Sequence, residues 1–186
     1  MKHLYAILLA VIILSVAGCA SADKTKGEFS ETRAYRTVDE LDPDLPSDNI
    51  DFVTDIYVMS DPELQKQTFE ALTIVNDERS KQGLDPLMWD SRLETDAATR
   101  VQEIANMFDK KHNRPDGRYW YTLDPGYLLG ECIYKGKGSA SKVMEAWMEN
   151  PADNENFFSP DITKMAISIF GEEDGTCYWV ALFAAN

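Results

Sequence analysis

The sequence predicts an α+β fold in which helices come first and a pair of strands comes last. Of its 186 residues, 44% are apolar and 11% are aromatic, which is enough to form a packed core. Apolar residues recur at helical spacing through the middle of the chain, whereas two continuous apolar runs, 165–170 and 177–183, lie at its end. This order is typical of helices that cover a small antiparallel sheet.

The start of the chain is expected to be an export signal that ends in a lipid-modified cysteine. A short positive head precedes the uninterrupted apolar run 4–14. This run is too short to span a bilayer as a helix, but it has the length of a signal-peptide core. The small residues before Cys19 resemble the bacterial lipobox, in which cleavage precedes the cysteine and its thiol receives a diacylglycerol. An ordinary secretory peptide that ends at Ala20 or Ala22 is the alternative.

Between the signal peptide (1–18) and the globular domain (63–186) we expect an acidic tether over 19–62. Residues 20–62 contain eleven acidic and four basic residues, and no helical apolar period is sustained there. The simplest interpretation is a solvated spacer that holds the domain away from the membrane. A weaker alternative is that the apolar residues of 50–58 pack on the domain as a strand or short helix.

Two helices are expected at the start of the globular domain. The first begins at 60–63, where a capping side chain precedes a proline, and it ends at Gly83. The second begins at Asp90, which caps it. Its apolar residues recur at helical spacing and are Leu93, Ala97, Val101, Ala105 and Phe108.

A third helix and a hairpin complete the predicted domain. The helix begins at Ser139 or Ser141, carries apolar residues on one face, and is stopped by Pro151. The runs 165–170 and 177–183 are continuous enough in apolar residues to be buried strands, and the acidic, glycine-containing segment between them predicts a turn.

The charge of the chain excludes two classes of partner. The chain has 18 Lys+Arg against 32 Asp+Glu, a net charge of −14, which becomes −15 when 1–18 is removed. Phosphate neutralisation requires clustered basic residues, so we expect no nucleic-acid partner. The same charge disfavours adsorption to anionic lipid. Removal of 1–18 also leaves His112 as the single histidine, which limits any histidine-built metal site.

Short motifs in the globular part form an ordered set that covers about 65–186. In chain order they are Asn76-x-x-Arg79, Gly83-Leu84-x-Pro86-Leu87-x-Trp89-Asp90, His112-Asn113-Arg114-Pro115-Asp116-Gly117, Gly130-Glu131, Asn150-Pro151 and Tyr178-Trp179-Val180-x-x-Phe183. In this order and spacing they resemble the CAP superfamily of cysteine-rich secretory, antigen 5 and pathogenesis-related proteins, in its bacterial SCP-like branch. The resemblance implies an α-β-α sandwich with an open groove.

The resemblance also supplies candidate groove residues. Family members commonly line the groove with two histidines and two acidic residues, which in some members bind a divalent metal. His112 and Glu131 match two of these positions, whereas Asp153 stands where bacterial relatives often have a histidine. We expect His112 and Glu131 to brace the groove as a hydrogen-bonded or charged pair. A weakly held Mg²⁺, Ca²⁺ or Mn²⁺ at these residues is the alternative, and no cofactor is certain.

Three other side chains complete the set of candidates. Arg114 lies in a predicted turn whose role is either purely structural or that of presenting Arg114 as an exposed contact beside the groove. Cys132 is expected to be a small buried hydrophobe rather than a nucleophile, because acidic surroundings raise the pKa of a thiol. The family fold brings Cys132 and Cys177 near each other, so a disulfide between them and a pair of free thiols are both open.

Three functions remain compatible with the sequence. The first is a membrane-anchored extracellular CAP domain that acts as a binding module on the bacterial surface. The second is a groove-based, metal-assisted hydrolase of envelope or extracellular polymers, and the third is a lipid- or sterol-binding protein. One histidine, with Asp153 in place of another, favours binding over catalysis. The expected partners are the membrane, through lipid on Cys19, and an unidentified protein, glycan or lipid ligand.

Overall fold

The computed structural model describes residues 36–41, 43 and 61–186. The predicted signal peptide, the predicted lipidation site Cys19 and the apolar segment 50–58 lie outside these residues. Within the described part of the chain, no helix combines the length and the apolar composition needed to cross a bilayer.

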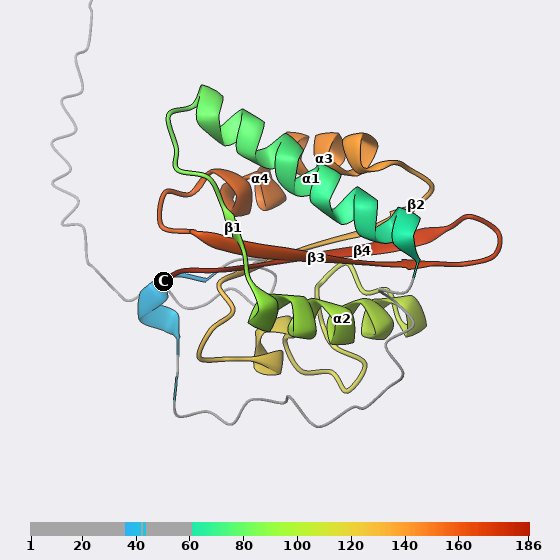
Figure 1. Ribbon diagram of the computed structural model, residues 1–186. Helices are drawn as coiled ribbons and strands as arrows, with labels where there is room; N and C mark the ends of the chain where they lie inside the picture. The colour runs from blue at the N-terminus through green and yellow to red at the C-terminus, as the bar shows by residue number, and fades with distance from the viewer. Residues whose placement is uncertain (1–35, 42, 44–60) are drawn as a thin grey trace, which may run out of the picture.

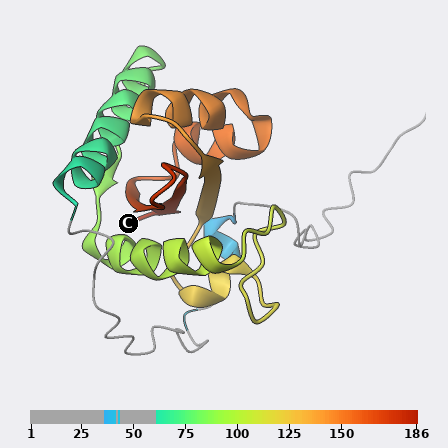
Figure 2. The ribbon, with the colours of Figure 1, turned by 90° about the vertical axis from the view of Figure 1, so that its right-hand side faces the viewer.

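The domain is an α-β-α sandwich of three layers (Figures 1 and 2). The central sheet has the strand order β1-β3-β4-β2, and its strands are β1 (Met88–Trp89), β2 (Gly130–Gly136), β3 (Lys164–Gly171) and β4 (Cys177–Ala184). One face is covered by α1 (Pro62–Lys81), α3 (Ala140–Glu149) and α4 (Pro151–Phe158), and the other by α2 (Ser91–Asn106). The predicted α+β class and its terminal hairpin are confirmed.

The sheet is mixed rather than purely antiparallel, which corrects one detail of the prediction. β3 pairs antiparallel with β4, and β4 with β2, but β1 runs parallel to β3. The backbone N–H of Met88 donates to the carbonyl of Thr163 at 2.9 Å, and the N–H of Asp90 donates to that of Met165 at 3.2 Å. A strand of two residues is too short to show an alternation of apolar and polar side chains, so no periodic pattern in the sequence predicts β1.

Capping residues set the helix boundaries much as the sequence suggests. The Asp61 side chain accepts a hydrogen bond from the first turn of α1, and Asp90 accepts two from the first turn of α2. Pro151 does more than stop α3, because it is the first residue of a further helix, α4. Asn150 lies at the junction, where its side chain accepts from the N–H of Ala152 at 3.1 Å.

The core lies on both faces of the sheet, as the alternation of strand β4 illustrates. Successive side chains of a strand point to opposite faces. Those on the side of α1, α3 and α4 include Trp179, Ala181 and Phe183, and those on the side of α2 include Tyr178, Val180 and Leu182. Because both faces are buried, the sequence of this strand is continuously apolar.

Arg36 and Leu41 pack on the domain, and the short 3₁₀ helix η1 (Val38–Glu40) lies between them with no buried residue. The Arg36 guanidinium donates to the carbonyl of Pro125 at 2.9 Å and lies 4.3 Å from the centre of the Tyr121 ring. Arg36 is only 6% exposed. The expectation of a solvated spacer throughout 19–62 is therefore wrong for this segment, because one arginine finds carbonyl acceptors and an aromatic face on the domain.

Two of the sequence motifs hold connecting segments in place. Arg79 is buried and donates to the carbonyls of Phe157 at 2.7 Å and Ile162 at 3.3 Å, among others. The Asn76 amide donates to the carbonyl of Leu87 at 3.0 Å and accepts from its N–H at 2.8 Å. These side chains satisfy backbone groups that have no sheet or helix partner.

Candidate functional site

An arginine, a glutamate and a histidine form a charged cluster between α2 and the start of β2. The Arg100 Nε donates to Glu131 Oε2 at 2.6 Å, and Glu131 Oε1 lies 2.8 Å from Nδ1 of His112. The side chains of Arg100 and Glu131 have no exposed area, and that of His112 is 12% exposed. One buried carboxylate thus joins a guanidinium to an imidazole.

Local structure explains how the three residues meet. Arg100 follows Ala97 by three residues and precedes Ile104 by four, so it lies on the buried face of α2. Glu131 pairs with Leu182 in the sheet, which turns its side chain toward the same helix. His112 lies in the segment between α2 and β2, a segment that also contains the short helix η2 (Trp120–Leu123).

The backbone at His112 is unusual and is held by Arg100. Its φ of 64° is in the left-handed region, which few residues other than glycine adopt. The Arg100 Nη2 donates to the carbonyl of His112 at 3.2 Å and to that of Asn113 at 3.4 Å. The same guanidinium therefore fixes both the buried partner of the imidazole and the turn that carries it.

The pKa values of Glu131 and Arg100 favour the charged form of each. Burial acts to raise the pKa of Glu131, but the charge of Arg100 and the hydrogen bond from His112 outweigh it and hold that pKa below its usual range. Burial likewise acts to lower the pKa of Arg100, but the charge of Glu131 outweighs it and the pKa is raised. A carboxylate and a guanidinium are therefore the stable pair in this site.

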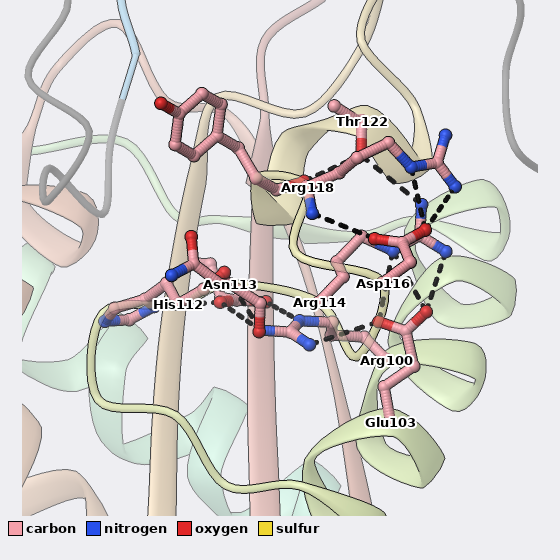
Figure 3. Close-up of polar contacts among 10 residues, drawn as sticks. Arg100, Glu103, His112, Asn113, Arg114, Asp116, Arg118 and Thr122 are labelled. Carbon is pink, nitrogen blue, oxygen red and sulfur yellow. Dashed lines mark hydrogen bonds and ion pairs between the residues drawn. The ribbon is translucent and has the colours of Figure 1, made fainter.

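Glu103 extends the cluster to a second arginine (Figure 3). Its Oε2 accepts from Arg100 Nη1 at 3.1 Å, and its Oε1 accepts from Arg114 Nη2 at 2.7 Å. Arg114 is buried, so the expectation that it is an exposed contact is wrong. The predicted turn itself is present, with Gly117 at a φ of 85°. It directs Arg114 inward, where the part-buried carboxylate of Glu103 is within reach of its guanidinium.

Asp153 takes part in a different arrangement. It is 7% exposed, and its Oδ2 accepts from the side-chain amide of Asn150 at 2.6 Å at the start of α4. Burial raises its pKa, while the charge of His112 acts in the opposite direction. Asp153 thus lies in the neighbourhood of His112, but its hydrogen bonds are with Asn150, at the start of its own helix, and with the thiol of Cys132.

The residues present do not fit the divalent metal that the family resemblance implies. Both oxygens of Glu131 contact Arg100, one of them also contacts His112, and Nδ1 of His112 faces Glu131. Across residues 36–41, 43 and 61–186, no three His, Cys, Asp or Glu side chains form a group that could hold a metal ion. The alternative of a weak metal site at His112 and Glu131 does not suit this donor set, because a guanidinium already supplies the positive charge there.

The two cysteines of the described domain are free thiols. Cys132 is opposite Ala181 and Cys177 is opposite Gly136, so they lie four residues apart along the paired strands. This separation is about 13 Å, well beyond the roughly 7 Å that a disulfide allows. A Cys132–Cys177 disulfide is therefore ruled out. Cys132 has no exposed area, and burial raises the pKa of its thiol well above the usual value, which makes it a poor nucleophile.

A close approach explains the glycine that precedes Glu131. A Cβ added to Gly130 would lie 2.8 Å from Cγ of Asn156 and closer still to its Oδ1. The amide of Asn156 donates to the carbonyl of Glu131 at 3.5 Å and to the Sγ of Cys132 at 3.4 Å. Gly130 is thus required because the α4 side chain lies directly against the strand.

Sequence reasoning missed the two residues that organise the cluster, Arg100 and Glu103. One signal was available, because Arg100 stands at a core position among the apolar residues of its helix. A buried charge of this kind requires a partner. The identity of that partner was not available from spacing, since Glu131 is 31 residues away.

Comparisons with known proteins agree with this architecture. Residues 72–183 match the model of the CAP, or cysteine-rich secretory protein, family. The chain is 29% identical over 105 residues to the uncharacterized protein YkwD of Bacillus subtilis, and the match covers 53% of this chain but only 40% of that protein.

Two solved bacterial structures share the fold. An outer surface protein from Borrelia burgdorferi has a TM-score of 0.58 at 20% identity, over 66% of this chain and 94% of that one. An extracellular protein with an SCP domain from Bacillus anthracis has a TM-score of 0.53 at 18% identity, over 66% of this chain and 41% of that one. Since the family match spans more than half of its length, the chain belongs to the cysteine-rich secretory protein (CAP) family.

Proposed function

We propose that this chain is an exported, lipid-anchored CAP domain that binds an envelope glycan through the surface around His112 and does not hydrolyse it. The observation that carries the proposal is the saturation of Glu131, whose oxygens are bonded to Arg100 and His112. A carboxylate that acts in hydrolysis must be free to contact water or substrate. In this cluster the Glu131 carboxylate is already bonded to Arg100 and His112.

Export and anchoring rest on the start of the sequence. The positive head, the apolar run 4–14 and the small residues before Cys19 have the pattern of a lipoprotein signal. The names of the two structural neighbours, an outer surface protein and an extracellular protein, support the same location. A diacylglycerol provides the two chains that stable membrane attachment requires.

The side chains near His112 suit a sugar. His112 is part-exposed, and Nε2 lies on the side of its ring away from the atom that faces Glu131. Its neighbour Asn113 pairs with Tyr119 in a β-bridge, and the rings of Tyr119 and Tyr121 stack at 5.5 Å. Imidazole and amide groups hydrogen-bond to hydroxyls, while aromatic faces pack against the apolar side of a sugar ring.

A second candidate function is a hydrolase in which His112 acts as a general base without metal. Glu131 bonds to Nδ1 of the imidazole. A carboxylate in this position fixes the tautomer and orientation of a histidine and leaves the other ring nitrogen to take a proton. This arrangement is the one observation that favours catalysis over binding.

The lipid- or sterol-binding alternative receives less support from two hollows of the described domain. The larger of the two, of about 620 Å³, is open and lined mostly by polar or acidic residues such as Asn154, Glu155 and Asp161. A cavity lined by Arg36, Leu129, Asn156 and Ile162, among others, has a volume of about 110 Å³. Pockets for ligands of this size usually have volumes of about 300 to 1,000 Å³. This cavity is therefore too small to hold a sterol.

A cosedimentation assay with purified peptidoglycan sacculi separates the two leading functions. The full chain in detergent is expected to pellet with the sacculi, His112→Ala to lose at least about fivefold in binding, and Lys66→Ala to bind normally. Lys66 is a matched control because its side chain is 71% exposed on α1, across the sheet from the site.

The supernatant of the same assay reports on catalysis. Time-dependent release of soluble fragments by the wild type, lost in His112→Ala, would establish the hydrolase instead. Failure of the wild type to pellet with sacculi would overturn the proposed glycan ligand. Parallel pelleting with neutral lipid vesicles distinguishes capture through the lipid anchor from binding through the domain.

A further inference from the structure

We propose that Arg100 is a built-in cation, which compensates the buried carboxylate of Glu131 in place of a metal ion, and that the space left on its removal binds free guanidinium ion. The proposal concerns the cluster of Arg100, Glu103, His112 and Glu131, and it holds whatever ligand the surface takes.

The oxygen atoms around Arg100 are arranged to accept hydrogen bonds from a guanidinium. All three guanidinium nitrogens donate to oxygen: Nε to Glu131, Nη1 to Glu103, and Nη2 to Glu131 and to the carbonyls of His112 and Asn113. These donor–acceptor distances run from 2.6 to 3.4 Å. Oxygen atoms distributed around a planar fork match a guanidinium, which has five donors in a fixed plane.

The carboxylates beside Arg100 have little or no contact with water and need a positive charge nearby. Glu131 has no exposed side-chain area, and Glu103 has only 16%. A carboxylate in such surroundings requires a cation, because removing it from water without compensation is costly. Arg114 neutralises Glu103 from the other side, whereas among residues 36–41, 43 and 61–186 the cationic or potentially cationic partners of Glu131 are Arg100 and the imidazole of His112. Without Arg100 the site would therefore attract a cation from solution.

Arg100 also shapes the surface that carries His112. The guanidinium holds the left-handed turn by bonding to the carbonyls of His112 and Asn113. Figure 3 shows the His112 ring at the opposite end of the cluster from Glu103, with Arg100 between them. Arg100 thus acts as a positioning residue: it shapes the His112 surface through its partners.

The test compares the wild type with Arg100→Ala in thermal unfolding and in ¹H–¹⁵N spectra of the His112 imidazole. Arg100→Ala is expected to melt at lower temperature and to gain about 5 °C in 20 mM guanidinium chloride, saturably, while the same concentration of sodium chloride has no effect. The His112 signal should return toward its wild-type position. Equal effects of the two salts would overturn the proposal.

Arg118→Ala is the matched control, because Arg118 lies in the same loop but pairs with Asp116 in an exposed salt bridge of 2.6 Å. Its melting temperature should not respond to guanidinium, and a response equal to that of Arg100→Ala would contradict a specific site. Should Arg100→Ala not fold in buffer, its refolding yield with and without 20 mM guanidinium becomes the measurement. A higher yield with guanidinium supports the proposal, and equal yields overturn it.

Metal titration provides an independent test on the wild-type chain. Calorimetry with Zn²⁺, Mn²⁺ or Ca²⁺ is expected to give no saturable heat together with no shift of the His112 signal. A saturable isotherm that moves this signal would show that the site accepts a metal despite Arg100, and would overturn the proposal. Arg100→Ala combined with Glu131→Gln, which removes both charges, should respond to neither guanidinium nor metal.

Discussion

Replacing Gly130 with alanine is expected to damage the domain through one contact. The added Cβ would lie 2.8 Å from Cγ of Asn156 and 3.3 Å from Cδ2 of Phe183. Neither neighbour is the end of a flexible side chain, since Asn156 is 1% exposed and Phe183 is fully buried. The amide must therefore move and give up its hydrogen bonds to the Glu131 carbonyl and the Cys132 thiol.

The expected loss is about 3 kcal/mol of unfolding free energy. Overpacking of a core site costs about 1 to 3 kcal/mol, and the two long hydrogen bonds that are lost add about 1 kcal/mol between them. For a chain of this length the loss corresponds to a fall of roughly 6 to 12 °C in melting temperature. Urea unfolding, followed by tryptophan fluorescence, measures it directly.

Two further variants make this prediction sharp. Gly171→Ala is the matched control, because a Cβ there would meet only Leu64 and Cys177, at 3.8 and 3.9 Å. It should change stability by less than about 1 kcal/mol. In Gly130→Ala combined with Asn156→Ala the contact with Asn156 is gone and only the 3.3 Å contact with Phe183 remains, so adding Gly130→Ala to Asn156→Ala should cost much less than adding it to the wild type. Additive losses would refute the assignment of the cost to this contact.

Three other predictions follow from the charged and polar groups. Because the pKa of Glu131 is lowered on folding, its contribution to stability is fully present above its unfolded pKa of about 4.3 and is lost as the pH falls through the folded value. Glu131→Gln should therefore flatten the acid limb of the stability curve, and a curve parallel to that of the wild type would contradict this. The Cys132 thiol should react with a disulfide reagent only after unfolding, while the partly exposed Cys177 reacts in the native protein; equal rates would be inconsistent with the burial of Cys132. Arg79→Met should lower the free energy of unfolding by about 3 kcal/mol in urea titrations, because it leaves several buried carbonyls unpaired, and a loss below about 1 kcal/mol would contradict that role.

Features of the fold that depend on local chemistry were predictable from the sequence. Asp61 and Asp90 cap their helices as expected, and two apolar runs separated by an acidic turn form the terminal hairpin. Strand β1 was not predictable, because its two residues form a strand only by pairing with the distant β3. Pro151 carried an ambiguous signal, since a proline ends one helix and begins another equally well.

The candidate site likewise has residues that could be predicted from the sequence and contacts that could not. His112 and Glu131 were identified through family resemblance, and nothing in the spacing of the chain implies that they touch. Arg114 was misplaced because a turn motif fixes the backbone but not the direction of a long side chain. The buried position of Arg100 was visible in its helix, but its roles depend on three segments that meet only in the folded domain.

The docking of residues 36–41 has a mechanical consequence for membrane attachment. With lipid on Cys19, the segment between the lipid and the folded domain would end at Arg36 rather than at the start of α1. The reason is that Arg36 is hydrogen-bonded to the carbonyl of Pro125. The longest possible distance from the lipid to the point of attachment then falls from about 150 Å to about 60 Å. The domain would therefore lie close to the bilayer, attached through Arg36 on its own surface. This attachment point limits which sides of the domain can face away from the membrane.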